Sequence, residues 1–213
     1  MSFGYIGDTS TSVKQQVKNK GILTTQESFD LERQGFLGGS LELIEETTVT
    51  SSQNVDFTAI KQDIFDVHFL QVSNHTFPAG SQDYGLRFYE SGVLETDSVY
   101  QYALEQMSVS GSRFESQSTG ANHIRIDNTA SEQWVNNWYC YLYNLGNSSK
   151  YSQVTFQKIP KRINTSGNYN SSGTFIEFGG GILAQASTVD GIRVYNSSKT
   201  ASAGNIKLYG VKT

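Results

Sequence analysis

The chain has 213 residues, enough for one domain of ordinary size with an additional segment but too few for two full domains. Apolar residues make up 37% and charged residues 17%, both below globular averages, while 12% aromatic residues exclude a disordered polar tract. The net charge is −4 without a basic stripe, so we expect no nucleic-acid partner, and no apolar stretch is long enough for a membrane span. A single cysteine, Cys140, excludes an internal disulfide and a cysteine-based zinc site.

Residues 1–50 carry little sustained strand periodicity. Within them, Thr24 and Glu27 have the spacing of a capping box, and Gly35 stands where a left-handed residue would end a helix. This pattern predicts one short helix near residues 25–34, which is too short to be stable without docking on something. It packs either on its own domain or, in an N-terminal attachment arm over residues 1–50, on a neighbouring protein. The residues that would anchor such an arm are Phe3, Tyr5, Ile6, Ile22, Phe29 and Leu31.

Residues 51–213 consist of short runs typical of β-strands, separated by Gly, Ser and Asn. These runs cover residues 64–69, 84–89, 98–104, 123–127, 138–143, 151–157, 174–178, 191–195 and 205–211. This part of the sequence shows almost no helical periodicity. It also shows no fixed-period repeat, which argues against a propeller or a solenoid. The pattern predicts an all-β domain, a jelly-roll-like β-sandwich, behind the N-terminal arm.

The run at residues 138–143 alternates most clearly. It places Trp138, Cys140 and Leu142 on one face, which we expect to be the core, and puts three tyrosines opposite. Because a buried cysteine behaves as a small hydrophobic residue, we expect an inert thiol at Cys140 rather than a nucleophile.

No set of side chains indicates catalysis. His68, His75 and His123 lie far apart without metal-ligand spacing, so we expect surface or loop histidines and no bound metal. Asp63 and Asp66 fall at the edge of a strand, where we expect solvated carboxylates rather than a glycosidase pair. The chain is therefore expected to be no enzyme and to need no cofactor.

The glycine run at residues 179–181 resembles a phosphate-binding loop only superficially. It lacks the following Lys-Ser/Thr and the helix that such a loop opens. We interpret it as a flexible bend between strands.

Exposed aromatic residues are the main candidate site. Tyr139, Tyr141 and Tyr143 would line one face of a strand, with Trp134 just before it. Aromatic rings flanked by Asn and Gln can bind sugars through ring contacts and amide hydrogen bonds. The alternative is that this row packs against a neighbouring sheet or subunit.

Segments spread along the chain resemble one family. They are residues 4–7, 20–24, 39–45, 55–58, 87–92, 187–193 and 205–211. Together they resemble small virion structural proteins of tailed marine bacteriophages, in the tail-fibre or capsid-associated class. The resemblance covers nearly the whole chain, and it implies a component of the particle without an active site.

The resulting expectation is a non-enzymatic virion protein, either a tail fibre or spike component or a head-surface decoration protein. It would dock on other virion proteins through the arm and form a homo-oligomer, with a trimer favoured by analogy. Residues 1–8 lack the features of a signal peptide, so we expect assembly in the bacterial cytoplasm. The alternative is a carbohydrate-binding module that recognises a host surface polysaccharide through Trp134 and the three tyrosines.

Overall fold

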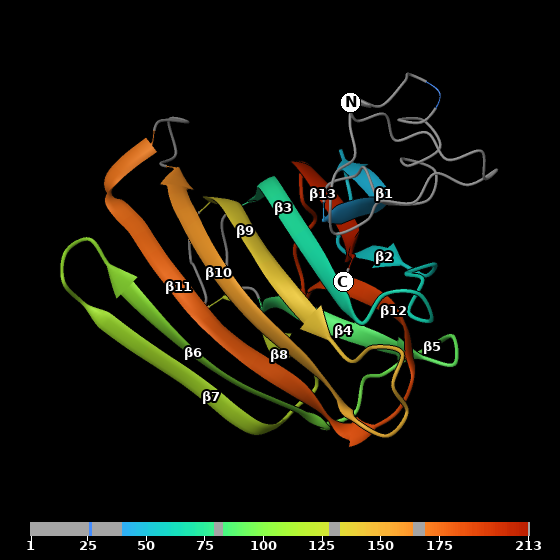
Figure 1. The fold of residues 1–213 in the computed structure, drawn as a ribbon. Coiled ribbons are helices and arrows are strands. Elements are labelled where there is room, and N and C mark those ends of the chain that lie inside the picture. Colours follow the sequence, from blue (N-terminus) through green and yellow to red (C-terminus); the bar gives the residue numbers. More distant parts are fainter. Residues whose placement is uncertain (1–25, 27–39, 79–82, 128–132, 164–168, 213) are drawn as a thin grey trace, which may run out of the picture. The chain divides into compact units, whose positions relative to one another are not determined.

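The computed structural model describes residues 26, 40–78, 83–127, 133–163 and 169–212 (Figure 1). The chain divides into two units, Met1–Leu41 and Glu42–Thr213, and the second unit is described below. The six predicted arm anchors lie outside the described residues, and so does the predicted helix near residues 25–34 apart from Gln26.

All thirteen elements in the described residues are β-strands. They are β1 (Leu41–Val49), β2 (Val55–Phe57), β3 (Val67–Phe77), β4 (Tyr84–Glu90), β5 (Val93–Leu94), β6 (Tyr100–Ser108), β7 (Arg113–Ala121), β8 (Ile124–Arg125), β9 (Gln133–Tyr143), β10 (Tyr151–Ile163), β11 (Tyr169–Ala186), β12 (Val189–Asn196) and β13 (Ala203–Val211). The prediction of an all-β fold is confirmed.

The strands form two antiparallel sheets. The large sheet has eight strands in the order β1-β13-β3-β9-β10-β11-β6-β7. The small sheet has the order β2-β12-β4-β5, and β8 pairs with β4. In Figure 1, β9, β10, β11, β6 and β7 run side by side in one twisted layer.

The two sheets share one hydrophobic core. The large sheet contributes Leu70, Val72, Trp138, Cys140, Leu142, Val154 and Phe156, and the small sheet contributes Phe57, Leu86, Phe88, Ile192 and Val194. Since both sheets bury one face in this cluster, the arrangement is consistent with a β-sandwich. Cys140 is buried as predicted, and burial raises the pKa of its thiol.

The large sheet begins before residue 50. Strand β1 pairs with β13 at the edge of the sheet, although Leu41 and Leu43 are exposed. Ion pairs attach this edge strand: Glu42 lies 3.0 Å from Lys61, and Glu46 lies 3.4 Å from Lys207. Charged side chains are common on edge strands, and they weaken the alternation by which a strand is recognised in a sequence.

The glycine run at residues 179–181 is not a bend between strands, as the sequence suggested. It lies inside β11, where Gly179 pairs with Phe156 on one side and with Leu104 on the other. A Cβ at Gly179 would come within 2.4 Å of the backbone oxygen of Ala103. The glycines therefore allow a close approach of neighbouring strands, which is the other common reason for glycine in a strand.

Candidate functional site

The alternation of β9 places its tyrosines on the outward face of the large sheet. Tyr139 and Tyr141 are 37% and 38% exposed, and Tyr143 is half-buried. Trp138 on the same strand points into the core, as predicted. Trp134 also belongs to β9, but its side chain lies outside the described part of the chain.

Two further aromatic residues join the tyrosines from neighbouring strands. The ring of Phe69 on β3 lies 5.0 Å from the ring of Tyr141 and 5.8 Å from that of Tyr139. The ring of Tyr209 on β13 lies 6.1 Å from that of Phe69. Sequence reasoning missed both residues, although each alternates with a buried leucine on its strand. We call this cluster of Phe69, Tyr139, Tyr141, Tyr143 and Tyr209 the aromatic platform.

Uncharged polar side chains border the platform on β10. The hydroxyl of Tyr139 donates to Oε1 of Gln157 at 2.6 Å, which fixes the orientation of both side chains. Gln153 and Thr155 are exposed on the same strand and face Tyr143 and Tyr141, respectively. Aromatic rings beside amides and hydroxyls present both kinds of contact that a sugar makes.

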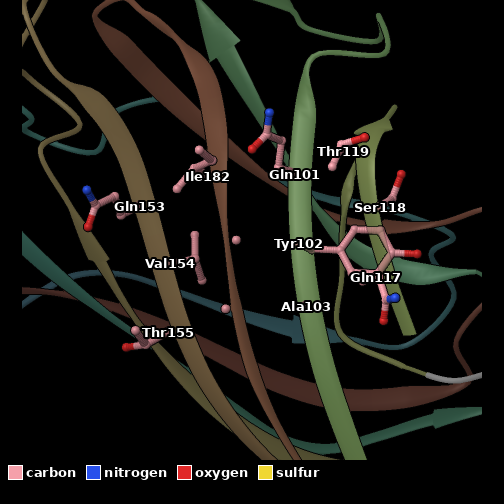
Figure 2. Close-up of a pocket in the computed structure, with 12 residues that line it drawn as sticks. Gln101, Tyr102, Ala103, Gln117, Ser118, Thr119, Gln153, Val154, Thr155 and Ile182 are labelled. Atoms are coloured by element: carbon pink, nitrogen blue, oxygen red, sulfur yellow. The ribbon is translucent and has the colours of Figure 1, made fainter. Parts of the chain in front are cut away.

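The outward face of the described residues includes three shallow depressions. The largest has a volume of about 430 Å³ and is formed by β6, β7, β10 and β11 (Figure 2). The second, of about 410 Å³, lies beside Phe69, Tyr139 and Gln157, and the third, of about 350 Å³, lies between Tyr141, Thr155 and Phe178. Each volume falls within the usual range for small-ligand sites, although these depressions are open to solvent.

The depressions are electrically neutral. Of the residues that line them, only Lys158 is charged, and its side chain is fully buried. The other side chains supply aromatic and aliphatic carbon, amides and hydroxyls. Such a lining can bind an uncharged polar ligand, whereas phosphate or carboxylate groups would find no accessible cation in it.

A buried ionic cluster lies on the opposite face of the large sheet. The ammonium of Lys158 on β10 lies 2.9 Å from a carboxylate oxygen of Asp127 and 3.0 Å from one of Glu177 on β11. Burial raises the pKa of Glu177 to about 7, although Lys158 acts in the opposite direction. Burial alone would lower the pKa of Lys158, but the two carboxylates outweigh it and the pKa is raised. All three side chains are almost completely buried, so this cluster belongs to the core and not to the outward face.

The prediction of surface or loop histidines is wrong for His68 and His75, which are buried residues of β3, whereas His123 does lie in the loop between β7 and β8 but is buried there. His68, His75 and His123 are only 0%, 2% and 8% exposed. His68 and His75 lie at positions of β3 that face the core, and burial lowers the pKa of each histidine, to about 4 for His75 and His123. Each ring has one short polar contact: Nε2 of His68 with the Ile60 carbonyl, Nδ1 of His75 with the Tyr84 hydroxyl, and Nδ1 of His123 with Oδ1 of Asn122, all at 2.7 Å.

Asp63 and Asp66 are exposed, as predicted. Among the described residues, no group of three or more His, Cys, Asp or Glu side chains could hold a metal ion. In the same part of the chain, no helix has the length and apolar character needed to cross a membrane. No protein-family model and no curated protein matches this sequence.

Proposed function

We propose that the protein is a non-enzymatic structural component of a bacteriophage particle whose jelly-roll-like β-sandwich recognises a host surface polysaccharide. The observation that carries the recognition role is the aromatic platform beside three neutral depressions on one exposed sheet face. The particle role rests on the resemblance of the sequence to virion proteins of tailed bacteriophages.

Three of the resembling segments are neighbours in the small sheet. Residues 55–58 contain β2, and residues 87–92 and 187–193 overlap β4 and β12; β12 lies between β2 and β4 in the sheet. The guanidinium of Arg193 donates to both carboxylate oxygens of Asp56, at 2.6 and 2.7 Å, and to the Tyr89 hydroxyl at 2.8 Å. The resemblance therefore falls on residues that build the sandwich, which supports a shared fold for the displayed domain.

In this proposal the N-terminal segment attaches the sandwich to the particle. Its apolar and aromatic residues Phe3, Tyr5, Ile6, Ile22, Phe29 and Leu31 contact other virion proteins, at the tail or on the head surface. The protein is a homo-oligomer, with a trimer favoured, and its location is the virion.

Truncation tests the attachment role. Strand β1 begins at Leu41, so a variant that lacks residues 1–39 keeps the whole large sheet. We expect this variant to fold but to be absent from purified particles, whereas immunogold electron microscopy labels the full-length chain on the head or on the tail. Normal occupancy of the truncated chain on particles would overturn the attachment role, and an absence of label for the full-length chain would overturn the virion location.

A polysaccharide array tests the recognition role. We expect the full-length chain to bind at least one neutral surface polysaccharide, and Tyr141→Ala to weaken this binding because Tyr141 lies at the centre of the platform. Tyr151→Ala is the matched control, since Tyr151 is 46% exposed and does not line any of the three depressions. Equal losses for the two variants would contradict a site on the platform.

A further inference from the structure

Small residues form one row straight across the outward face of the large sheet. The pairing register places Tyr141, Thr155, Gly180, Ala103 and Gln117 opposite one another in turn, on β9, β10, β11, β6 and β7. Residues that are directly opposite in paired strands share a face, so these five residues form a line perpendicular to the strands. The three middle residues are small, and the sheet surface is low along them.

Longer side chains stand in the rows on either side. One row is Gln153, Ile182 and Gln101, and the other is Gln157, Phe178, Glu105 and Glu115. Two of the depressions follow the low row: the one of about 430 Å³ is lined by Thr155, Gly180, Ala103 and Gln117, and the one of about 350 Å³ by Tyr141 and Thr155. They share Thr155 as a lining residue, so they are neighbours along this row. We call the line from Tyr141 to Gln117 the cross-strand trough.

Figure 2 shows the middle and the far end of this trough. Gln153 and Thr155 on β10 lie on one side, and Ala103 on β6 and Gln117 on β7 lie on the other side of β11. The trough spans four strand-to-strand spacings, or about 19 Å at the usual spacing of about 4.8 Å. A groove of this length accommodates several sugar units of a linear chain rather than one isolated ring.

The amide side chains beside the trough and the ring of Tyr141 at one end of it determine what the trough can bind. The side chains of Gln101, Gln117 and Gln153 have no hydrogen bond to any other described residue, so each can donate to and accept from a ligand. The only charges in the three rows are two carboxylates: Glu105, which lies 3.6 Å from the guanidinium of Arg113, and Glu115, which lies opposite Glu105 on β7. No cation lines the trough, which disfavours a phosphorylated or uronic-acid polymer.

From this geometry we infer that the cross-strand trough binds a linear, uncharged polysaccharide that lies across the strands. One ring stacks on Tyr141 at the platform, the following units pass over Thr155, Gly180 and Ala103, and the chain ends at the amide of Gln117. The small residues let the sugar rings approach the sheet, and the flanking amides hydrogen-bond to the hydroxyls. This inference rests on the recognition role proposed above and gives it a ligand class and a direction.

Filling the trough tests the inference. Ala103→Gln, in the full-length chain, puts a neutral side chain into the trough at an exposed position. Ala186→Gln is the matched control, because Ala186 is also exposed on the large sheet but lies six residues along β11 from Gly180. The probes are linear neutral gluco- and manno-oligosaccharides of increasing length, with a polyuronate series for comparison, and binding is measured by calorimetry.

In the wild type and in Ala186→Gln, affinity rises with ligand length until the ligand spans the trough. In Ala103→Gln the short ligands bind as before, but the longest ligands bind about tenfold more weakly, the change expected when a hydrogen bond and its neighbouring contacts are lost. Gln117→Ala, which fills nothing, also weakens only the long ligands. Tyr141→Ala weakens ligands of every length.

The contrary outcomes separate the trough from the recognition role. Suppose that Tyr141→Ala weakens binding while Ala103→Gln and Gln117→Ala match the wild type for long ligands. The ligand then does not lie along the trough, and the recognition role stands. If the wild type binds none of the neutral probes, both are wrong. Tight binding of the polyuronates overturns the uncharged ligand class, and a change of oligomeric state in Ala103→Gln without any glycan binding makes this face an interface between copies of the chain.

Discussion

Trp138 on β9 and Tyr84 on β4 join the two sheets across the core. The indole N–H of Trp138 donates to the Tyr84 hydroxyl at 2.8 Å, and the two rings meet edge to face with their centroids 5.8 Å apart. Nδ1 of His75 lies 2.7 Å from the same hydroxyl. Because an indole N–H can only donate, the Tyr84 hydroxyl accepts from Trp138, and it also forms a hydrogen bond with Nδ1 of His75, whose pKa burial lowers to about 4.

Tyr84→Phe is expected to lower the free energy of unfolding by about 2–3 kcal/mol. The substitution keeps the ring but leaves the buried indole N–H of Trp138 and the imidazole of His75 without this partner, and an unsatisfied buried polar group costs about 1–3 kcal/mol. Urea denaturation measures the change. Tyr209→Phe, on the outward face, is the control and should change stability by less than about 0.5 kcal/mol; an equal effect of the two variants would contradict the link between the sheets.

Mild acid is expected to destabilise the protein between about pH 6.5 and pH 4. Burial lowers the pKa of His75 and of His123 to about 4, so in this range the unfolded chain binds protons that the folded chain does not. The free energy of unfolding therefore falls as the pH falls, by about 3 kcal/mol for His75 alone on the relation between pKa and free energy. Urea midpoints measured across this range check the prediction, and a midpoint that rises steadily with acid would contradict it.

Glu177 changes the free energy of unfolding in the opposite direction to the histidines as the pH falls. Its substitution therefore gives the control for the acid experiment. Burial raises the pKa of Glu177 to about 7, so below pH 7 the folded chain holds a proton that the unfolded chain holds only below its ordinary value of 4.5. This group therefore contributes stability as the pH falls from about 7 to 4.5. Glu177→Gln removes the contribution, and stability should then fall more steeply with acid than in the wild type.

Lys158→Met is expected to destabilise the protein by about 3–5 kcal/mol at neutral pH. The variant leaves the carboxyl groups of Asp127 and Glu177 in the core without their cation, and an uncompensated buried charge has a cost of this size. Glu177→Gln keeps the pair between Lys158 and Asp127 and should cost less than about 1 kcal/mol at the same pH. Chemical denaturation compares the two variants, and equal losses would show that the cluster does not depend on its cation.

The face assignment of β9 could be predicted from the sequence because local alternation determines it. Trp138 is buried and Tyr141 is exposed, as the pattern indicated. The ionic cluster could not be predicted in this way, since Glu177 is buried while its neighbours Ile176 and Phe178 are exposed. The reason is a long-range contact: β10 pairs with β11 so that Lys158 lies opposite Glu177, and no local pattern contains that register.

The edge strand β7 shows a second limit of sequence reasoning. Its residues are mostly exposed on both faces, so they do not alternate and the strand was not predicted. The histidines show a third limit. The hydrogen-bond partner of the buried His75 is the hydroxyl of Tyr84, which belongs to the other sheet, and no local pattern contains this contact. The trough depends on the register of five strands, and only the structure gives it.

Gly181→Ala is expected to destabilise the protein by about 1–3 kcal/mol through overpacking. A Cβ at this position would lie 2.6 Å from the backbone oxygen of Gln101 and 2.7 Å from Cγ2 of Ile124, so β11 would have to move away from β6. Gly120→Ala is the control, since its Cβ would meet nothing closer than the Ser98 oxygen at 3.6 Å. Thermal unfolding of the two variants checks the difference, and a Gly181→Ala variant as stable as the wild type would show that the strands are free to separate here.

Protection of tyrosines from nitration tests most directly whether the outward face of the large sheet is the recognition surface. The full-length chain is treated with tetranitromethane with and without a neutral polysaccharide that it binds, and each tyrosine is quantified by mass spectrometry. We expect the polysaccharide to protect the exposed Tyr139 and Tyr141 and to leave the exposed Tyr151 as reactive as before. Protection of Tyr151 with none at Tyr139 and Tyr141, or no protection of any tyrosine by any neutral polysaccharide, would contradict this expectation.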